Sequence, residues 1–228
     1  MVDAIIDTLQ IDDQLIEARI TPKTKALILC SPSNPTGSVY SAAELEALAA
    51  VLRRHPQVWV ISDEIYEHIN CVGAHASIAA CPEMYDRTIG INGVAKAYAM
   101  TGWRIGCLAA PLALSKACSK LQGQYTSGPC SVSQVAATEA FAGPQDCVET
   151  MRQAFERRRD LIVQLAKGIP GLEVNKPEGA FYLFPKCSSF FGKSDGKHVI
   201  NNSTDFAMYL LEEGHVATVG GDAFGDPE

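Results

Sequence analysis

Residues 92–106 read NGVAKAYAMTGWRIG and connect two parts of an alternating pattern. It joins the end of one short apolar run to the start of another, and it carries Lys96 among small residues and Arg104 beside Trp103. Short apolar runs separated by segments of helical period are typical of βαβ units and a mainly parallel sheet. We therefore predict an α/β fold for the first part of the chain.

Apolar runs on both sides of this stretch have the length and composition of buried strands. They cover residues 25–30, 58–62, 88–92 and 104–109. A helix is predicted from Ser41 to about Arg54, because Ser41 and Glu44 form a capping box and leucines follow at helical spacing. Strands with intervening helices in this order make half of a doubly wound sheet.

Beyond residue 130 the pattern becomes mainly helical, with helices predicted at residues 131–141 and 145–167. Short strands at 172–174, 180–184 and 216–219 and a helix at 204–213 indicate a smaller α+β unit. We place the boundary inside the long helix, so that residues 1–150 and 151–228 belong to different domains. Residue 1 falls within a helical pattern and residues 220–228 form a loop without a closing element, so we expect a segment of a longer protein.

Composition and charge narrow the possible partners. The net charge of -7 and a pI near 5.3 argue against a basic face for nucleic acid. No apolar run is long enough to span a bilayer and no signal-peptide pattern follows Met1, so we expect a cytoplasmic protein without a membrane partner. The cysteines form no C-x-x-C pair and are expected to be reduced and mostly buried. The histidines do not cluster at ligand spacing, so no metal is predicted.

Polar segments follow the carboxyl ends of the predicted strands, where α/β enzymes place their ligands. They are residues 33–37 (SNPTG), 63–66 (DEIY), 95–98 (AKAY) and 101–106 (TGWRIG). Each has an ordinary explanation when taken singly, as a turn, a helix cap or a solvated charge. Their order and spacing along one chain favour a shared site.

Together these segments resemble the signature of the class I and II aminotransferases of pyridoxal-phosphate (PLP) fold type I, and most closely the bacterial aspartate aminotransferases. The resemblance is most specific in residues 92–106 and extends over the whole chain, from the strand before residues 33–37 to residues 178–182 (EGAFY). It implies that residues 1–150 are the C-terminal half of the large PLP-binding domain and that residues 151–228 are part of the small α+β domain. It further implies a homodimer that transfers an amino group between an amino acid, with aspartate as the best guess, and a 2-oxo acid.

The resemblance implies that Lys96 forms the Schiff base with the PLP aldehyde and later moves a proton at the substrate Cα. An amine suits both tasks, because its pKa can be lowered until it acts as nucleophile and general base. Asp63 matches the carboxylate that keeps the pyridine nitrogen of PLP protonated and so stabilises the carbanion. The catalytic set is therefore predicted to be Lys96, Asp63 and Tyr66.

The remaining cofactor contacts also follow from the resemblance. Asn34 and Tyr66 match the residues that hydrogen-bond the phenolic oxygen of PLP, and Arg104 matches the arginine that grips its phosphate. The apolar residues around Arg104 argue against an exposed position for it. Ala95 stands where many relatives carry serine, which puts one phosphate contact in doubt.

Backbone and aromatic features complete the expected site. The resemblance implies a cis bond between Asn34 and Pro35, and Gly102 and Gly106 are expected to let backbone segments pack closely. Phe181 and Tyr182 fit either the substrate side of the site or core packing.

Other functions remain open. PLP lyases and synthases of the same fold share Lys96, Asp63 and Arg104, and a PLP-dependent transcription regulator can carry an aminotransferase-like domain, although no basic helix-turn-helix is present in this sequence. A pseudo-enzyme would retain the five site residues only by coincidence. The family's glycine-rich phosphate loop and its carboxylate-binding arginine do not occur in these 228 residues, so we expect the chain to be inactive alone and the full-length protein to be an aminotransferase.

Overall fold

The computed structural model describes residues 12–226, and the helical pattern noted at residue 1 lies outside them. The chain runs through α1 (Asp13–Arg19), β1 (Ala26–Cys30), α2 (Ala42–Arg54), β2 (Trp59–Asp63), β3 (Thr88–Gly93) and β4 (Gly106–Ala109). Helices α3 (Leu112–Tyr125), α4 (Ser131–Ala142), α5 (Asp146–Lys167) and α6 (Ser203–Glu212) follow. Short 3-10 turns lie at Ile78–Ala80, Tyr85–Arg87, Thr101–Trp103, Ser188–Phe190 and Gly221–Phe224.

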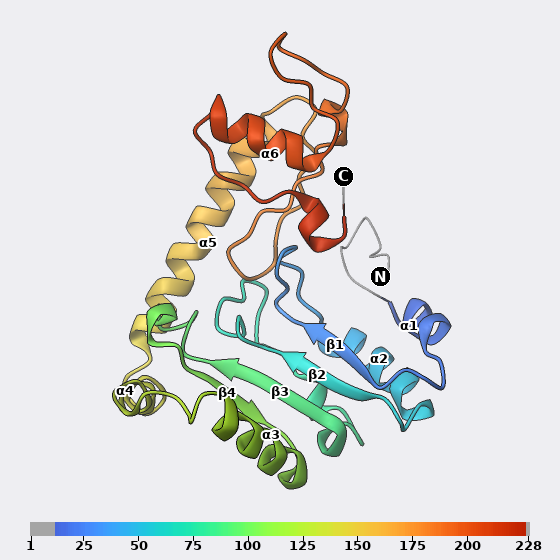
Figure 1. Ribbon diagram of the computed structural model, residues 1–228, viewed down its shortest axis with the longest axis vertical. Helices are drawn as coiled ribbons and strands as arrows, with labels where there is room; N and C mark the ends of the chain where they lie inside the picture. The colour runs from blue at the N-terminus through green and yellow to red at the C-terminus, as the bar shows by residue number, and fades with distance from the viewer. Residues whose placement is uncertain (1–11, 227–228) are drawn as a thin grey trace.

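The strands form one sheet in the order β1-β2-β3-β4 (Figure 1). Strands β1, β2 and β3 are parallel, whereas β4 runs antiparallel to β3. A parallel return would need a crossover, usually a helix, but the segment between Gly93 and Gly106 contains only a 3-10 turn. The predicted α/β class and mainly parallel sheet are confirmed. The predicted alternation is wrong between β2 and β3, where 3-10 turns replace a helix.

Helix α2 forms because its first turn is capped and one of its faces is apolar. The Ser41 amide donates to Glu44 Oε2 at 2.7 Å and the Glu44 amide donates to Ser41 Oγ at 3.3 Å, which confirms the capping box. Leu45, Leu48 and Leu52 are almost fully buried in the main core, together with residues of β1 and β2. Burying side chains of this size contributes about 1.5–3 kcal/mol each, so α2 and the sheet stabilise each other.

The opposite face of the sheet is open in the described residues. Ile28 of β1 is 71% exposed, and its partner in the register is Ile61 of β2. Successive side chains of a strand alternate between faces, so Asp63 lies on the same open face as Ile61. Strand β4 is exposed at every position and α3, which the sequence analysis did not predict, buries no residue.

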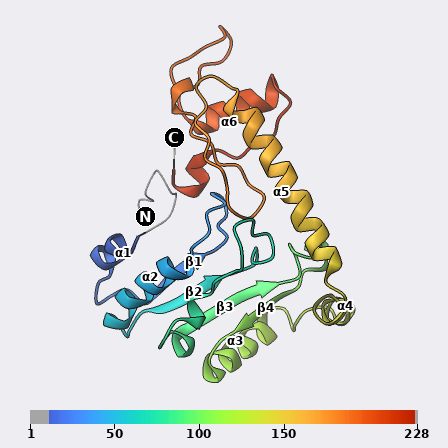
Figure 2. The ribbon, with the colours of Figure 1, turned by 180° about the vertical axis from the view of Figure 1, so that it is seen from behind.

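The C-terminal part consists of helices and loops. Helix α5 leads from the sheet to α6, and the segment after α5 turns back toward the sheet (Figures 1 and 2). The strands predicted at 172–174, 180–184 and 216–219 are wrong. Among the described residues of this part, the β-structure is limited to isolated bridges such as that of Glu173 with Lys186. The boundary near residue 150 falls in α5 and stays a prediction.

Of the cysteines, only Cys187 is buried, while Cys107, Cys130 and Cys147 are exposed, so the prediction of mostly buried thiols is wrong. Among the helices of residues 12–226, none combines the length and apolar character that a membrane span requires.

Candidate functional site

The site lies where the parallel strands end. Cys30 of β1, Asp63 of β2 and Ile91 of β3 are paired in register, so the loops that follow β1 and β2 begin side by side. The Ser31 amide donates to the Asp63 carbonyl at 3.1 Å and the Glu64 amide donates to the Ile91 carbonyl at 2.9 Å. The half-buried Asp63 side chain accepts from the Ile65 amide at 3.2 Å. The Asp63 carboxylate is thereby held at the end of β2, between the ends of β1 and β3.

Asn34 and Tyr66 meet at a third residue, Tyr182. Asn34 Nδ2 donates to the Tyr182 hydroxyl at 3.3 Å, and the Tyr66 hydroxyl is hydrogen-bonded to the same oxygen. Tyr66 is only 3% exposed. Burial, followed by the Tyr182 hydrogen bond and the nearby charge of Asp63, raises the pKa of Tyr66 far above its usual range, so its hydroxyl stays protonated. Tyr66 is therefore available as a hydrogen-bond donor at neutral pH.

Lys96 follows β3 in a tight turn, with its carbonyl accepting from the Ala99 amide at 3.2 Å. Its Nζ lies 5.6 Å from the ring centroid of Tyr66 and 5.6 Å from that of Phe181. The half-buried amine makes no ion pair or hydrogen bond within residues 12–226. Aromatic faces attract an ammonium weakly compared with a carboxylate, so this amine is held in place without being neutralised by a partner.

Arg104 does not join the other four predicted residues. Its side chain is exposed, its Nη1 donates to the Thr101 carbonyl at 3.0 Å, and its backbone is left-handed with φ 57°. The expectation that Arg104 would not be exposed is wrong, because the apolar strand beside it is itself exposed. Within the described chain it shares no hydrogen bond or ring contact with Asn34, Asp63, Tyr66 or Lys96.

The glycine that permits close packing in this stretch is Gly93. A Cβ at Gly93 would lie 2.9 Å from the Ile105 carbonyl oxygen and 3.0 Å from Gly106 Cα. A Cβ at Gly102 would meet nothing within 4 Å, and one at Gly106 would approach no atom closer than 3.5 Å. The expectation for Gly102 and Gly106 is therefore wrong. Gly93 is the glycine that lets β3 and the turn before β4 approach closely, because a side chain there would collide with the turn.

The loop after β1 packs against the segment that precedes Tyr182. The Gly37 carbonyl accepts from the amides of Glu178 at 2.9 Å and Gly179 at 2.8 Å. A Cβ at Gly37 would lie 2.5 Å from Pro177 Cβ, and one at Gly179 would lie 2.6 Å from Pro32 Cβ. Side chains at these two glycines would push the segments apart, so the pair makes this contact possible.

Both X-Pro bonds of this loop are cis. The predicted cis bond between Asn34 and Pro35 is confirmed, and the bond between Ser31 and Pro32 is also cis. The second cis bond was not predicted from the sequence.

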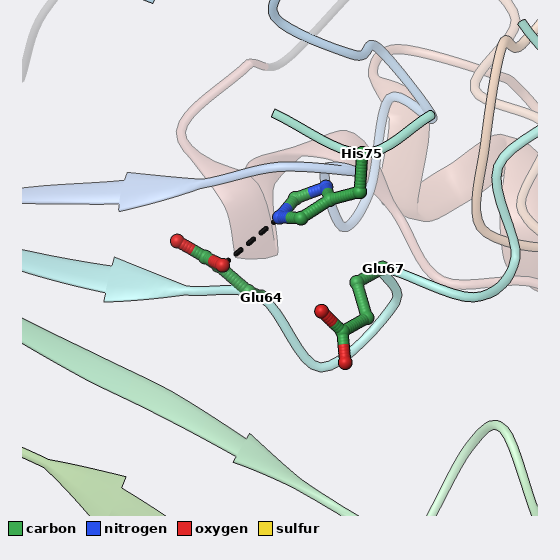
Figure 3. Close-up of side chains that lie close together, drawn as sticks. All are labelled: Glu64, Glu67 and His75. Carbon is green, nitrogen blue, oxygen red and sulfur yellow. Dashed lines mark hydrogen bonds and ion pairs between the residues drawn. The ribbon is translucent and has the colours of Figure 1, made fainter. Parts of the chain in front are cut away.

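A second polar cluster adjoins the site (Figure 3). Glu64 Oε2 is hydrogen-bonded to His75 Nε2 at 2.9 Å, and Glu64 Oε1 accepts from Ser77 Oγ at 2.6 Å and Ser62 Oγ at 2.8 Å. Burial alone would raise the pKa of Glu64, but the hydrogen bonds from His75, Ser77 and Ser62 outweigh it and leave the pKa below its ordinary value. Glu64 thus fastens the loop around residue 75 to the end of β2.

The cluster also brings metal-ligand atoms together. Glu64, Glu67 and His75 each place one such atom within 4.8 Å of the others. Sequence spacing could not reveal this, since a loop folds back to bring His75 to Glu64. Both Glu64 oxygens already hold hydrogen bonds, so the observed arrangement is that of a hydrogen-bonded cluster.

Tyr182 is the functional candidate that sequence reasoning left undecided. Its ring contacts Tyr66 edge to face at 5.7 Å, and Phe181 stacks on Phe155 of α5 at 5.1 Å. Phe181 thus shares in packing while its ring also faces Lys96. The only signal in the sequence was the EGAFY segment itself.

Comparisons with known proteins extend over nearly the whole chain. Residues 3–228 match the family described as aminotransferase class I and II. The bifunctional aspartate aminotransferase and glutamate/aspartate-prephenate aminotransferase of Petunia hybrida is 49% identical over 229 residues, covering 98% of this chain and 48% of the relative. The aspartate/prephenate aminotransferase of Cereibacter sphaeroides is 51% identical over 213 residues, covering 92% of this chain and 53% of the relative.

Solved structures agree in fold. The aspartate aminotransferase from Rhizobium meliloti superposes with a TM-score of 0.91 at 46% identity, covering 96% of this chain and 56% of that one. The aromatic aminotransferase from Pyrococcus horikoshii superposes with a TM-score of 0.90 at 37% identity, covering 99% and 58%. The chain spans about half the length of the curated relatives it matches.

Proposed function

This chain belongs to the aminotransferase class I and II family, and from that premise we propose that its protein transfers an amino group from an amino acid to a 2-oxo acid with PLP as cofactor. The observation that carries the proposal is the convergence of an amine, a carboxylate, a phenol and an amide at the strand ends. These groups belong to Lys96, Asp63, Tyr66 and Asn34. Aspartate is the proposed amino donor, because the names of the relatives in Petunia hybrida and Cereibacter sphaeroides both include it.

The donor set fits PLP chemically. When bound, PLP supplies an aldehyde that links to amines and a pyridine ring that draws electrons from the substrate Cα. Lys96 is proposed to bind the aldehyde carbon, which its lack of an ion-pair partner in the described chain supports. Once freed by the substrate, its amine takes the proton from Cα as general base. A lysine already neutralised by a carboxylate would serve neither task as well.

The other residues tune the ring. Asp63 is proposed to hold a proton on the pyridine nitrogen, and each pKa unit of that effect corresponds to about 1.4 kcal/mol. Tyr66 and Asn34 are proposed to donate hydrogen bonds to the phenolic oxygen, which the high pKa of Tyr66 supports. Arg104 is proposed to bind the phosphate, because a guanidinium fork matches a dianion. The exposed position of Arg104 leaves it accessible to such a group.

Larger features of the protein remain proposals. We propose a large domain up to about residue 150 and a small domain beyond it, with the protein forming a cytoplasmic homodimer. We further propose that the 228-residue chain does not complete transamination alone, since it spans about half the length of its relatives.

The test is chemical labelling. The chain and the expected full-length protein are incubated with PLP, reduced with borohydride and mapped by peptide mass spectrometry, beside Lys96→Ala and the matched surface control Lys120→Ala. We expect the label on Lys96 and its loss only in Lys96→Ala. Label spread evenly over surface lysines in both chains would reject the PLP assignment. Spread in the shorter chain alone would mean that further segments build the site.

A further inference from the structure

The Tyr182 hydroxyl lies between the two residues proposed to contact the phenolic oxygen of the cofactor. Asn34 Nδ2 is 3.3 Å from it, and the Tyr66 hydroxyl is hydrogen-bonded to it. An amide nitrogen only donates, so the Tyr182 oxygen accepts from Asn34. Its own hydrogen is then free for another acceptor, and the Tyr66 oxygen is the partner in reach.

The bond between the two hydroxyls can run in either direction, and donation from Tyr182 to Tyr66 is the direction that leaves the Tyr66 hydrogen free. A phenol has one hydrogen and two lone pairs, so a Tyr66 oxygen that accepts from Tyr182 still has its own hydrogen to donate. Tyr66 is 3% exposed, and buried hydroxyls normally find partners. In the part of the chain that the structure describes, its hydroxyl has no other hydrogen-bond partner. When Tyr182 is the donor, the Tyr66 hydrogen has no acceptor among these residues and is available to a bound group.

The position of Tyr182 is held from both sides. The Ala180 amide donates to the Ile69 carbonyl at 2.8 Å, and the Gly179 amide donates to the Gly37 carbonyl at 2.8 Å. These bonds connect the Tyr182 segment to the turn that contains Tyr66 and to the loop that contains Asn34. A side chain fixed to both partners can set their orientation.

We propose that Tyr182 is a positioning residue, whose hydroxyl accepts from Asn34, donates to Tyr66 and so directs the Tyr66 hydrogen to the phenolic oxygen of the cofactor. The proposal rests on the proposed function, because it needs PLP at this site. The charged or titratable groups near the pair are Asp63, Cys30 and Lys96.

The consequence is spectroscopic. A phenolic oxygen that receives less donation from Tyr66 attracts the proton on the neighbouring Lys96 nitrogen more strongly. Removing the Tyr182 hydroxyl should therefore raise the pH midpoint of the absorbance change of the bound cofactor. A neutral hydrogen bond corresponds to an upward movement of between about 0.5 and 1 pH unit.

The experiment compares the full-length holoenzyme with Tyr182→Phe, with Tyr66→Phe and with the double variant. Tyr209→Phe serves as a matched control, because this tyrosine of α6 contacts His198 in the preceding loop and, in the described residues, makes no ring contact with a site residue. We expect the midpoint to rise in Tyr182→Phe, to stay in Tyr209→Phe, and to show no further rise when Tyr182→Phe is added to Tyr66→Phe. An unmoved midpoint, or an equal rise in the Tyr66→Phe background, overturns the proposal.

Two further measurements keep the outcomes separate. Incorporation of 3-fluorotyrosine at Tyr182 makes its hydroxyl a stronger hydrogen-bond donor and should lower the pH midpoint of the absorbance change. This variant tests the role of Tyr182 if Tyr182→Phe does not fold. Borohydride labelling of the wild-type enzyme reports on the proposed function itself. A wild type without label on Lys96 rejects both proposals, whereas a labelled wild type with an unmoved midpoint rejects only the role of Tyr182.

Discussion

At the scale of single residues, Asp63 and Lys96 are held in different ways. Asp63 ends a strand, and backbone hydrogen bonds fix the chain on both sides of it. Lys96 lies in a turn and contacts two aromatic rings. Asp63 is thus fixed through its backbone, whereas Lys96 is positioned through contacts of its side chain.

Replacing Asp63 with asparagine keeps the shape and removes the charge. We expect kcat/KM of the full-length enzyme to fall about 10- to 100-fold, as the loss of a charged hydrogen bond of about 1.5–3 kcal/mol implies. Steady-state kinetics measure the fall, and borohydride labelling of Lys96 should persist in the variant. Asn34→Ala is the comparison, with a smaller fall expected because its hydrogen bond is neutral. Equal activity in Asp63→Asn and wild type would contradict the role of the carboxylate.

Residues also show where prediction from the sequence succeeds. Asn34, Asp63 and Lys96 could be placed at one edge because parallel strands end together. The exposure of Arg104 could not be predicted, since it depends on what covers β4. The bonds of Tyr182 could not be predicted either, because they join side chains that are far apart in the sequence and meet only after long-range packing.

At the scale of elements, His198 connects the polar loop before α6 to that helix. His198 Nδ1 is 3.1 Å from Asp195 Oδ2 and His198 Nε2 is 3.1 Å from Glu212 Oε2, while Lys197 pairs with Glu213 at 2.8 Å. The hydrogen bond to Asp195, followed by that to Glu212, raises the pKa of His198. The sequence predicted a helix at residues 204–213 but not its connection to the loop before it.

The interaction of His198 with Asp195 and Glu212 should weaken as the pH rises. A raised pKa means that the stabilisation is complete below the unfolded value of about 6.5 and is lost as the pH climbs through the folded value. Amide hydrogen exchange in residues 193–200, corrected for the intrinsic rate, should therefore be faster at pH 8 than at pH 6, values chosen on either side of about 6.5. His198→Gln should abolish the difference. A pH-dependent difference that persists in His198→Gln would assign the effect to another group.

The contact between the loop after β1 and the EGAFY segment depends on two glycines. Gly179→Ala would place a methyl 2.6 Å from Pro32 Cβ and 2.9 Å from the Ile69 carbonyl oxygen. Overpacking of this kind costs about 1–3 kcal/mol, so we expect a lower unfolding midpoint in denaturant and weaker retention of PLP. Gly123→Ala is the matched control, because a Cβ there meets nothing within 4 Å. An equal drop of the unfolding midpoint in both variants would show that the close approach at Gly179 is not the cause of the lost stability.

At the scale of the whole molecule, the described residues leave large apolar side chains exposed on the sheet and on α3 and α4. Parallel sheets are usually covered on both faces, yet Ile28 is 71% exposed, and Tyr125 of α3 and Val135 of α4 are 81% and 71% exposed. The mainly parallel class was predictable from the sequence because it depends on local patterns. The open face was not, because neither periodicity nor composition tells which surfaces remain uncovered.

This surface leads to a prediction for the isolated chain. We expect the 228-residue chain to bind an apolar fluorescent dye and to self-associate, and Ile28→Thr to reduce both effects. Dye fluorescence and light scattering measure them, with the full-length protein as the reference. A monomeric chain without dye binding would mean that the face is covered in solution.

The contact of Gly37 with Gly179 also affects the order in which the site can form during protein synthesis. Ribosomes build the chain from its N-terminus, so Lys96 is made well before residues 178–182 exist. If the Tyr182 segment is needed to orient Asn34 and Tyr66, the nascent chain contains Lys96 before the proposed site can be complete. Binding of the proposed cofactor would then be a late event in synthesis, and a ribosome stalled between these two segments would hold a chain that has Lys96 but lacks Tyr182.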